Sequence, residues 1–208
     1  MEQIWLTLQR GGIIMIPLLL SSIIALGIII EKVITLRRRK ILVPEIIAVI
    51  DNIKAPEDVS LALSICDKHK GVFSNVIEIG LKNTQLPKDD IKEMYEEQGR
   101  QEVRVLERGL SILETVAAIA PLLGLLGTVL GMIRVFDVIS TQGLGQTESL
   151  SGGISEALIT TVVGLSIGIP TLVFYNYYTS KAENLILDIE KYSNDLLHKI
   201  QKFRKTTE

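Results

Sequence analysis

The stretch "SGGISEALITTVVGLSIGIPTLVFYNYY", residues 151–178, decides the fold of this 208-residue chain. Residues 157–180 carry no charge over 24 positions, which is enough to cross a hydrocarbon core of roughly 30 Å at about 1.5 Å per helical residue. One acid, Glu156, stands directly before this uncharged run. We therefore expect a transmembrane helix here, and the position of its acid needs an explanation.

Two further stretches have the same character. Residues 11–30 hold no charge over 20 positions and residues 115–133 none over 19, although 22% of the chain is charged. The first stretch is too long for a cleaved signal peptide and lacks a small-residue cleavage site before the basic run that follows it. We therefore expect three retained spans.

The orientation of the spans follows from the lysine and arginine residues near their ends. Basic residues flank the ends at 37–40, 104–108 and 181, whereas the opposite ends hold only Arg10 and Arg134. This asymmetry predicts an amino terminus and a turn on the outer side of the membrane and a cytoplasmic carboxyl terminus.

The loop between the first two spans is predicted to be helical, because Pro44, Pro56 and Pro87 each begin a stretch with acids in its first turn. No strong break follows Pro87 before Pro121, so one helix is expected to run from the loop into the second span. Periodic apolar residues likewise predict that the third span continues as a helical tail.

The predicted fold class is an all-α integral membrane protein with three transmembrane helices, two of them extended far into the cytoplasm, and a helical cytoplasmic loop. The expected segments are a periplasmic amino terminus with the first span (1–36), the cytoplasmic loop (37–112), the second span (113–138), a periplasmic turn (139–152), the third span (153–180) and a cytoplasmic tail (181–208).

Several classes of function lack support in the sequence. "GLLGTVLG" at 124–131 has glycines but no Gly-Lys-Ser/Thr, so it is no phosphate loop, and we expect neither an enzyme nor a cofactor. His69 and His198 have no ligand-like companions, so no metal site is expected, and Cys66 is expected to be inert. Residues 37–112 hold 13 basic and 13 acidic side chains, which gives no reason to expect nucleic acid.

The glycines of the second and third spans are predicted to serve helix packing, because small residues four apart let helix backbones approach closely in lipid. The predicted packing residues are Gly124, Gly127, Gly131, Gly164, Gly168, Pro121 and Pro170.

Glu156 is predicted to be a functional acid that faces the bundle interior, water or a partner, since lipid disfavours a carboxylate. Thr160 lies one helical turn further on the same side, Thr161 lies further round, and Thr128 is the one polar residue between Thr115 and Arg134. The alternative is that Glu156 merely caps the outer end of its span.

These residues resemble a known family. "ISEALITTVVGLSIGIPTLVFYN" is similar to the third-span motif of the ExbB/TolQ/MotA proton-channel family, in its ExbB/TolQ branch, and "APLLGLLGTVLGMI" at 120–133 is similar to the second-span motif. The resemblance extends over nearly the whole chain and includes the three-span topology.

The resemblance implies a subunit of an inner-membrane motor that uses the proton motive force for work on the cell envelope, such as biopolymer or nutrient transport across the outer membrane. It implies a homopentamer around two copies of a single-span ExbD/TolR-like partner, with a TonB-like or TolA-like protein as a further candidate partner. Glu156, Thr128 and Thr161 would line the ion pathway, and Thr160 is a further candidate for it, although it stands where the family often has a small apolar residue. The resemblance also implies the bacterial inner membrane as the location, so that the outer side is the periplasm. Arg134 and Asp137 are expected to pair with each other or between subunits.

Two alternatives from other classes stay open. A passive membrane scaffold would explain the glycines but not Glu156, and a small-solute transporter subunit would need a substrate-sized cavity that three spans with one acid hardly provide. The driving ion, proton or sodium, is also open, because extra hydroxyls such as that of Thr160 favour sodium coordination.

Overall fold

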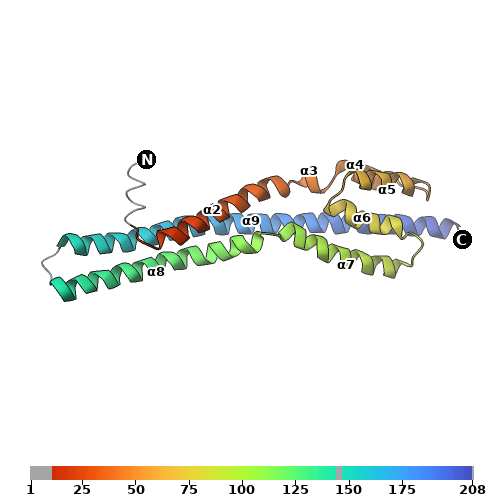
Figure 1. The fold of residues 1–208 in the computed structure, drawn as a ribbon. Helices are drawn as coiled ribbons and strands as arrows, with labels where there is room; N and C mark the ends of the chain where they lie inside the picture. Colours follow the sequence, from red (N-terminus) through yellow and green to blue (C-terminus); the bar gives the residue numbers. More distant parts are fainter. Residues whose placement is uncertain (1–10, 144–146, 208) are drawn as a thin grey trace. The chain divides into compact units, whose positions relative to one another are not determined.

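The structure, a computed structural model, describes residues 11–143 and 147–207. Arg10 and the middle of the expected periplasmic turn lie outside these residues. The described residues form eight helices and no strand, which confirms the all-α class (Figure 1). The helices are α2 (Met15–Thr35), α3 (Arg38–Ile41), α4 (Pro44–Asn52), α5 (Asp58–Lys68), α6 (Val72–Lys82), α7 (Lys88–Glu107), α8 (Leu110–Gln142) and α9 (Thr147–Thr207).

The chain divides into two compact units. The first, here the span unit, comprises Met1–Glu31 and Gly109–Tyr177, and the second, here the loop unit, comprises Lys32–Arg108 and Tyr178–Glu208. Each unit gathers segments that are far apart in the sequence.

Three of the described helices are long and apolar enough to cross a membrane. The candidate spans are Met15–Thr35, Leu110–Thr141 and Leu150–Lys202, with mean hydropathies of 2.1, 2.2 and 2.0 over their most apolar stretches. Most of their side chains are exposed in the single chain, with 17%, 33% and 28% buried in the same order. Such exposed apolar surface is expected of helices that meet lipid or other membrane helices.

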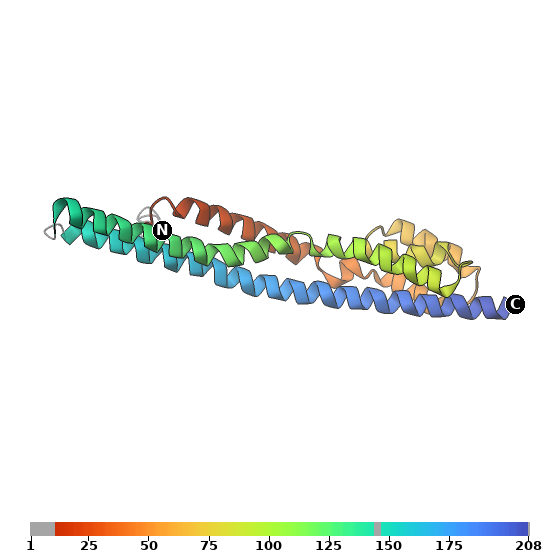
Figure 2. The ribbon, with the colours of Figure 1, turned by 90° about the horizontal axis from the view of Figure 1, so that it is seen from below.

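The core of the span unit lies where its three helices meet. Met15 and Leu18 of α2 and Ala120 of α8 are buried together, and Val163 and Ile167 of α9 pack against them. Figures 1 and 2 show α8 beside the first part of α9. The span unit is therefore a three-helix cluster that brings the second and third spans into contact.

The expectation of one uninterrupted helix from Pro87 into the second span is wrong. α7 ends at Glu107 and α8 begins at Leu110, because Gly109 adopts a left-handed φ of +85° that a helix cannot continue through. α9, in contrast, runs without interruption from the third span into the tail. α8 continues to Gln142 and α9 begins at Thr147, so both helices reach into the segment expected to form the turn.

Lys32 holds the carboxyl end of α7. Its Nζ, on a side chain that is 2% exposed, donates to the Leu106 carbonyl oxygen at 2.9 Å. The last carbonyls of a helix have no partner within the helix and carry partial negative charge. A buried ammonium at this position therefore satisfies a carbonyl that the end of α7 leaves unpaired.

The loop unit has a core of its own, built by helices that begin where the sequence predicts. α4 begins at Pro44, α5 at Asp58 and α7 at Lys88. Phe73 of α6 is fully buried and its ring meets that of Tyr192 of α9 edge to face, at 5.7 Å between centroids. α4 is joined to the tail by Lys199, whose Nζ donates to the carbonyl oxygens of Ile50 and Asp51 at the end of α4.

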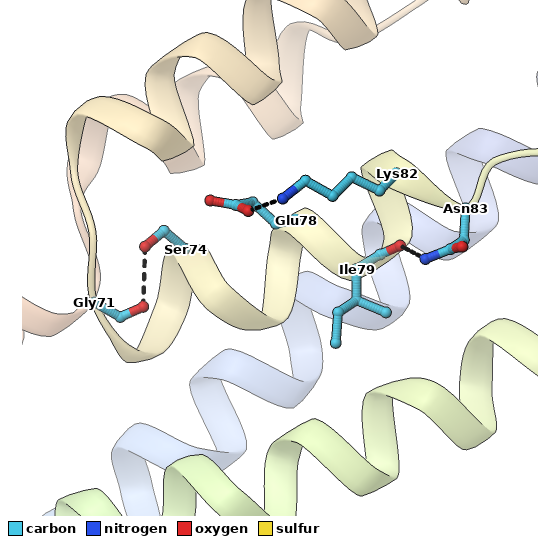
Figure 3. Close-up of polar contacts among 6 residues, drawn as sticks. All are labelled: Gly71, Ser74, Glu78, Ile79, Lys82 and Asn83. Atoms are coloured by element: carbon cyan, nitrogen blue, oxygen red, sulfur yellow. Dashed lines mark hydrogen bonds and ion pairs between the residues drawn. The ribbon is translucent and has the colours of Figure 1, made fainter.

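Local polar contacts define both ends of α6 (Figure 3). Ser74 Oγ donates to the Gly71 carbonyl at 2.9 Å at the start, and Asn83 Nδ2 donates to the Ile79 carbonyl at 2.9 Å at the end. Between them Lys82 pairs with Glu78, which raises the pKa of the Lys82 ammonium. These contacts satisfy groups within α6 and indicate a structural role.

Cys66 is buried in α5 at 1% exposure. Burial, with a smaller contribution from Glu78, raises the pKa of its thiol to about 11. Because the thiolate is the reactive form, the thiol at neutral pH has the low reactivity that the sequence predicts.

Candidate functional site

The backbones of α8 and α9 touch through glycines. A methyl group built on Gly124 would lie 2.9 Å from the Thr160 carbonyl oxygen, and one on Gly164 would lie 2.6 Å from the Ala120 carbonyl oxygen. Both separations are too short for real carbon atoms, so neither position accepts a larger residue without a shift of backbone. The two helices approach as closely as glycine allows.

The same contact continues along the spans. A methyl group on Gly131 would lie 2.8 Å from Ala157 Cβ, one on Gly168 would lie 2.6 Å from Pro121 Cγ, and one on Gly127 would overlap the Thr160 side chain. Pro170 lies within α9 with its side chain exposed. Five of the seven predicted packing residues are thus glycines of this interface, and Pro121 lies against it.

Glu156 lies at one end of this interface and is paired with an arginine. Arg134 Nη1 of α8 donates to both carboxylate oxygens of Glu156 at 2.7 Å each. The Glu156 side chain is 18% exposed and that of Arg134 is 57% exposed. Among the residues that the structure describes, Arg134 forms its ion pair with Glu156, so the first of the two expected pairings, with Asp137 of the same chain, is wrong. The other, a pairing between subunits, stays a prediction.

Gly12 covers the other side of the acid. A side chain on Gly12 would overlap the Glu156 carboxylate, and Gly12 has a φ of +66°, in the left-handed region that favours glycine. Gly12 directly precedes the turn into α2. Residues of all three candidate spans or their flanks, namely Gly12, Arg134 and Glu156 itself, therefore meet at the carboxylate.

The three predicted threonines differ in their surroundings. Thr160 is 1% exposed and donates its hydroxyl to the Ala157 carbonyl at 2.8 Å, rather than to Glu156. Thr161 is half-buried and donates across the interface to the Gly124 carbonyl at 3.2 Å. Thr128 donates to the Leu125 carbonyl of its own helix, and no described contact joins it to Glu156. The structure thus brings Thr160 and Thr161 to the α8–α9 contact and leaves Thr128 apart from it.

Two residues of this site escape sequence reasoning. The sequence pairs Arg134 with its neighbour Asp137 and places it among the charges at the span ends, and it shows Gly12 only as part of an uncharged run. The sequence feature that points to Arg134 is that it is a single cation at the outer end of the second span, while the third span carries a single acid at its own outer end. The signal for Gly12 was its place in a Gly-Gly pair at the start of the first span.

The arrangement can hold a carboxylate next to the membrane without leaving its charge uncompensated. A charge in a low-dielectric setting costs several kcal/mol unless it is paired and hydrogen-bonded, and the Arg134 contacts meet both needs. Next to it the α8–α9 contact is apolar and tightly packed, with few hydroxyls. A polar group of this kind within an otherwise dry helix bundle is typical of proteins that pass ions or protons across a membrane.

The fold and site thus define a helical membrane protein with three candidate spans and an arginine-paired acid at the contact of the second and third. Residues 68–191, which include the whole of this contact, match the MotA/TolQ/ExbB proton channel family. The chain belongs to this family.

Relatives of known name support the same assignment. An ExbB-like biopolymer transport protein of Synechocystis is 32% identical over 192 residues, which cover 83% of each chain. The biopolymer transport protein ExbB of Aquifex aeolicus is 33% identical over 132 residues, covering 64% of this chain and 78% of its own. The Tol-Pal system protein TolQ of Pseudomonas aeruginosa is 38% identical over 81 residues, or 39% of this chain and 35% of its own.

Proposed function

We propose that this protein is the ion-channel subunit of an inner-membrane motor that couples the proton motive force to work on the cell envelope. The names of the ExbB relatives state biopolymer transport for those proteins, and we propose the same kind of process for this chain. A proton moving through a potential of 100 mV releases about 2.3 kcal/mol, enough to drive a conformational step in a partner.

One observation carries the proposal: the paired carboxylate of Glu156 at the end of the glycine-packed α8–α9 contact. A passive scaffold would not need an acid in one candidate span whose charge an arginine of another span has to compensate. Thr161, which donates across the same contact, and Thr128 are proposed to add hydroxyls to the pathway. A proton path through membrane helices needs such polar groups. Their number must stay small, because many polar groups would admit a continuous column of water.

The assembly we propose is a ring of five copies around two copies of a single-span partner of the ExbD/TolR type. The exposed apolar side chains of the three candidate spans are the surfaces available for such contacts. Glu156 would then come near the partner's helix once the Arg134 pair opens.

The assembly is tested by native mass spectrometry of the protein made together with a single-span candidate encoded beside it. A complex of five copies with two of the partner supports the proposal. A stable monomer or dimer that binds no such partner contradicts it.

The role of Glu156 is tested by Glu156→Gln in cells that lack the native copy and its paralogues. Energy-dependent transport should be lost while the protein stays inserted and assembled, because the carboxylate serves the pathway rather than the fold. Full transport activity in this variant would favour the capping alternative.

The proposed topology places the amino terminus and the 139–152 turn in the periplasm and the loop and tail in the cytoplasm. A reporter that is active only in the cytoplasm should be active when it is fused after Lys88. Ser140→Cys, at an exposed position near the end of α8, should react with a membrane-impermeant maleimide in intact cells. Labelling of position 140 only after lysis would reverse the assignment.

A further inference from the structure

Arg134 and Glu156 form an ion pair whose two members differ in their access to solvent. Arg134 Nη1 lies 2.7 Å from each carboxylate oxygen, so one guanidinium nitrogen engages the whole acid. The acid is the shielded member at 18% exposure and the guanidinium the accessible one at 57%. A cation bound at these two oxygens would therefore lie next to the Arg134 guanidinium.

The remaining surroundings of the acid are also closed. Backbone at Gly12 lies against the carboxylate so closely that any side chain there would overlap it. The Thr160 hydroxyl, the candidate sodium ligand one turn away, is donated to the Ala157 carbonyl and packs against Gly127 at 1% exposure. The burial of Thr160 against Gly127 therefore leaves its hydroxyl oxygen little room for an ion.

A sodium ion and a proton make different demands on such a site. A metal cation must exchange its hydration shell for several oxygen ligands, and a nearby fixed positive charge opposes its entry. Arginine stays charged under all physiological conditions, so the pair with Glu156 has no net negative charge to attract a cation. A proton needs only one oxygen that accepts it and a hydrogen-bonded route.

We propose that Arg134 is a specificity-determining and positioning residue of the Glu156 site. It holds the carboxylate within its own subunit, and by compensating the charge it keeps sodium from binding there, so that protons alone use the pathway. This inference rests on the proposed role of Glu156 in ion conduction.

The test uses the full chain with its single-span partner in lipid vesicles, with proton uptake followed by a trapped pH dye in the presence and absence of sodium chloride. The variants are Arg134→Gln, which removes the charge, Arg134→Lys, which keeps it, and Asp137→Asn as a matched control on the same helix. Sodium should not inhibit proton uptake by the wild type, the Lys variant or the control. In Arg134→Gln, sodium should lower proton uptake by about tenfold, the low end of the effect by which an uncompensated charge raises the local concentration of counter-ions.

A sodium effect that is the same in the wild type and in Arg134→Gln would overturn the proposal, as would sodium inhibition of the wild type or of Arg134→Lys. If Glu156→Gln conducts like the wild type, the proposed function itself fails, which is a separate outcome. The two failures are thus distinguishable.

A charge swap keeps the test decisive if Arg134→Gln does not assemble. The double variant Arg134→Glu with Glu156→Arg restores an ion pair between α8 and α9 but moves the carboxylate to the other helix. We expect it to assemble like the wild type and to take up protons at least about tenfold more slowly, because a displaced catalytic or conducting group loses its geometry. Sodium should leave the residual proton uptake of the swap unchanged, because the pair still contains an arginine, and inhibition of the swap by sodium would overturn the proposal. Wild-type proton uptake by the swap would instead contradict the proposed role of Glu156.

Discussion

The side chain of Thr160 in α9 occupies the space that a side chain at Gly127 in α8 would need. The two residues are 33 positions apart, and Thr160 is almost fully buried at this contact. A residue larger than glycine at position 127 is therefore compatible with this contact only if the side chain at position 160 is smaller or moves.

Gly127→Leu should separate the second and third spans. Overpacking of a tight contact typically costs about 1–3 kcal/mol, and here the inserted side chain would overlap Thr160. The loss should appear as a lower thermal unfolding midpoint in detergent and as loss of the oligomer on size exclusion.

Gly152→Ala is the matched control, because a methyl group at that position of α9 meets nothing within 4 Å. It should keep the midpoint of the wild type, since alanine favours a helix over glycine. Equal midpoints for Gly127→Leu and Gly152→Ala would contradict the packing role of Gly127.

Thr161→Val and Thr128→Val should slow ion-driven transport with little effect on assembly, because each keeps the shape of the side chain and removes a hydroxyl. Thr161→Val also removes the bond to the Gly124 carbonyl, which in a membrane is worth about 0.6 kcal/mol on average. Transport assays and unfolding midpoints on the same preparations separate the two effects.

Thr160→Ala is the comparison within the same helix. Because its hydroxyl serves its own helix, this change should lower stability through lost packing against Gly127 and leave ion transport nearly intact. Loss of transport in Thr160→Ala together with normal transport in Thr161→Val would reverse these assignments.

Lys32→Met should destabilise the loop unit, although it replaces a charge by an apolar side chain of similar length. The change leaves the Leu106 carbonyl at the end of α7 without its 2.9 Å donor, and an unsatisfied buried polar group costs about 1–3 kcal/mol. Hydrogen exchange of the last turn of α7 should increase. Lys70→Met, at an exposed position, should change it little, and equal exchange in both variants would argue against a capping role for Lys32.

Asp58 should make the start of α5 sensitive to acid. Its Oδ2 accepts the backbone N–H groups of Lys54 and Ala55, and these bonds hold the pKa of the Asp58 carboxyl below its ordinary value of 3.8. A carboxyl whose pKa is lower in the folded state stabilises the fold above its unfolded pKa, and this stability is lost as the pH falls through the folded pKa.

Amide exchange at residues 54 and 55 measures this effect locally. At neutral pH, Asp58→Asn should exchange faster than the wild type at these amides, and the difference should shrink below about pH 4. Glu57→Gln, whose side chain is exposed and lies next to Asp58 in sequence, should leave the two amides unchanged. A difference between wild type and Asp58→Asn that persists undiminished in acid would refute the linkage.

The sequence by itself determined the helical class, the three candidate spans and the starts of the loop helices. Each of these depends on local properties: the length of an uncharged run, the period of apolar residues, or a proline with acids behind it. The four-residue spacing of glycines on 124–131 and 164–168 is also local, and it predicts that the second and third spans each contact other helices.

Only the tertiary structure decided the partner of Glu156 and the break before the second span. Arg134 is 22 residues from Glu156 in the sequence, and Gly12 is 144 residues from it. Which charged residue pairs with an acid depends on the distance between helices, and the periodicity of a sequence does not encode that distance. Gly109 is compatible with a helix as well as with a left-handed turn. Its φ of +85° does not follow from the sequence, because glycine alone has no strong preference for either sign.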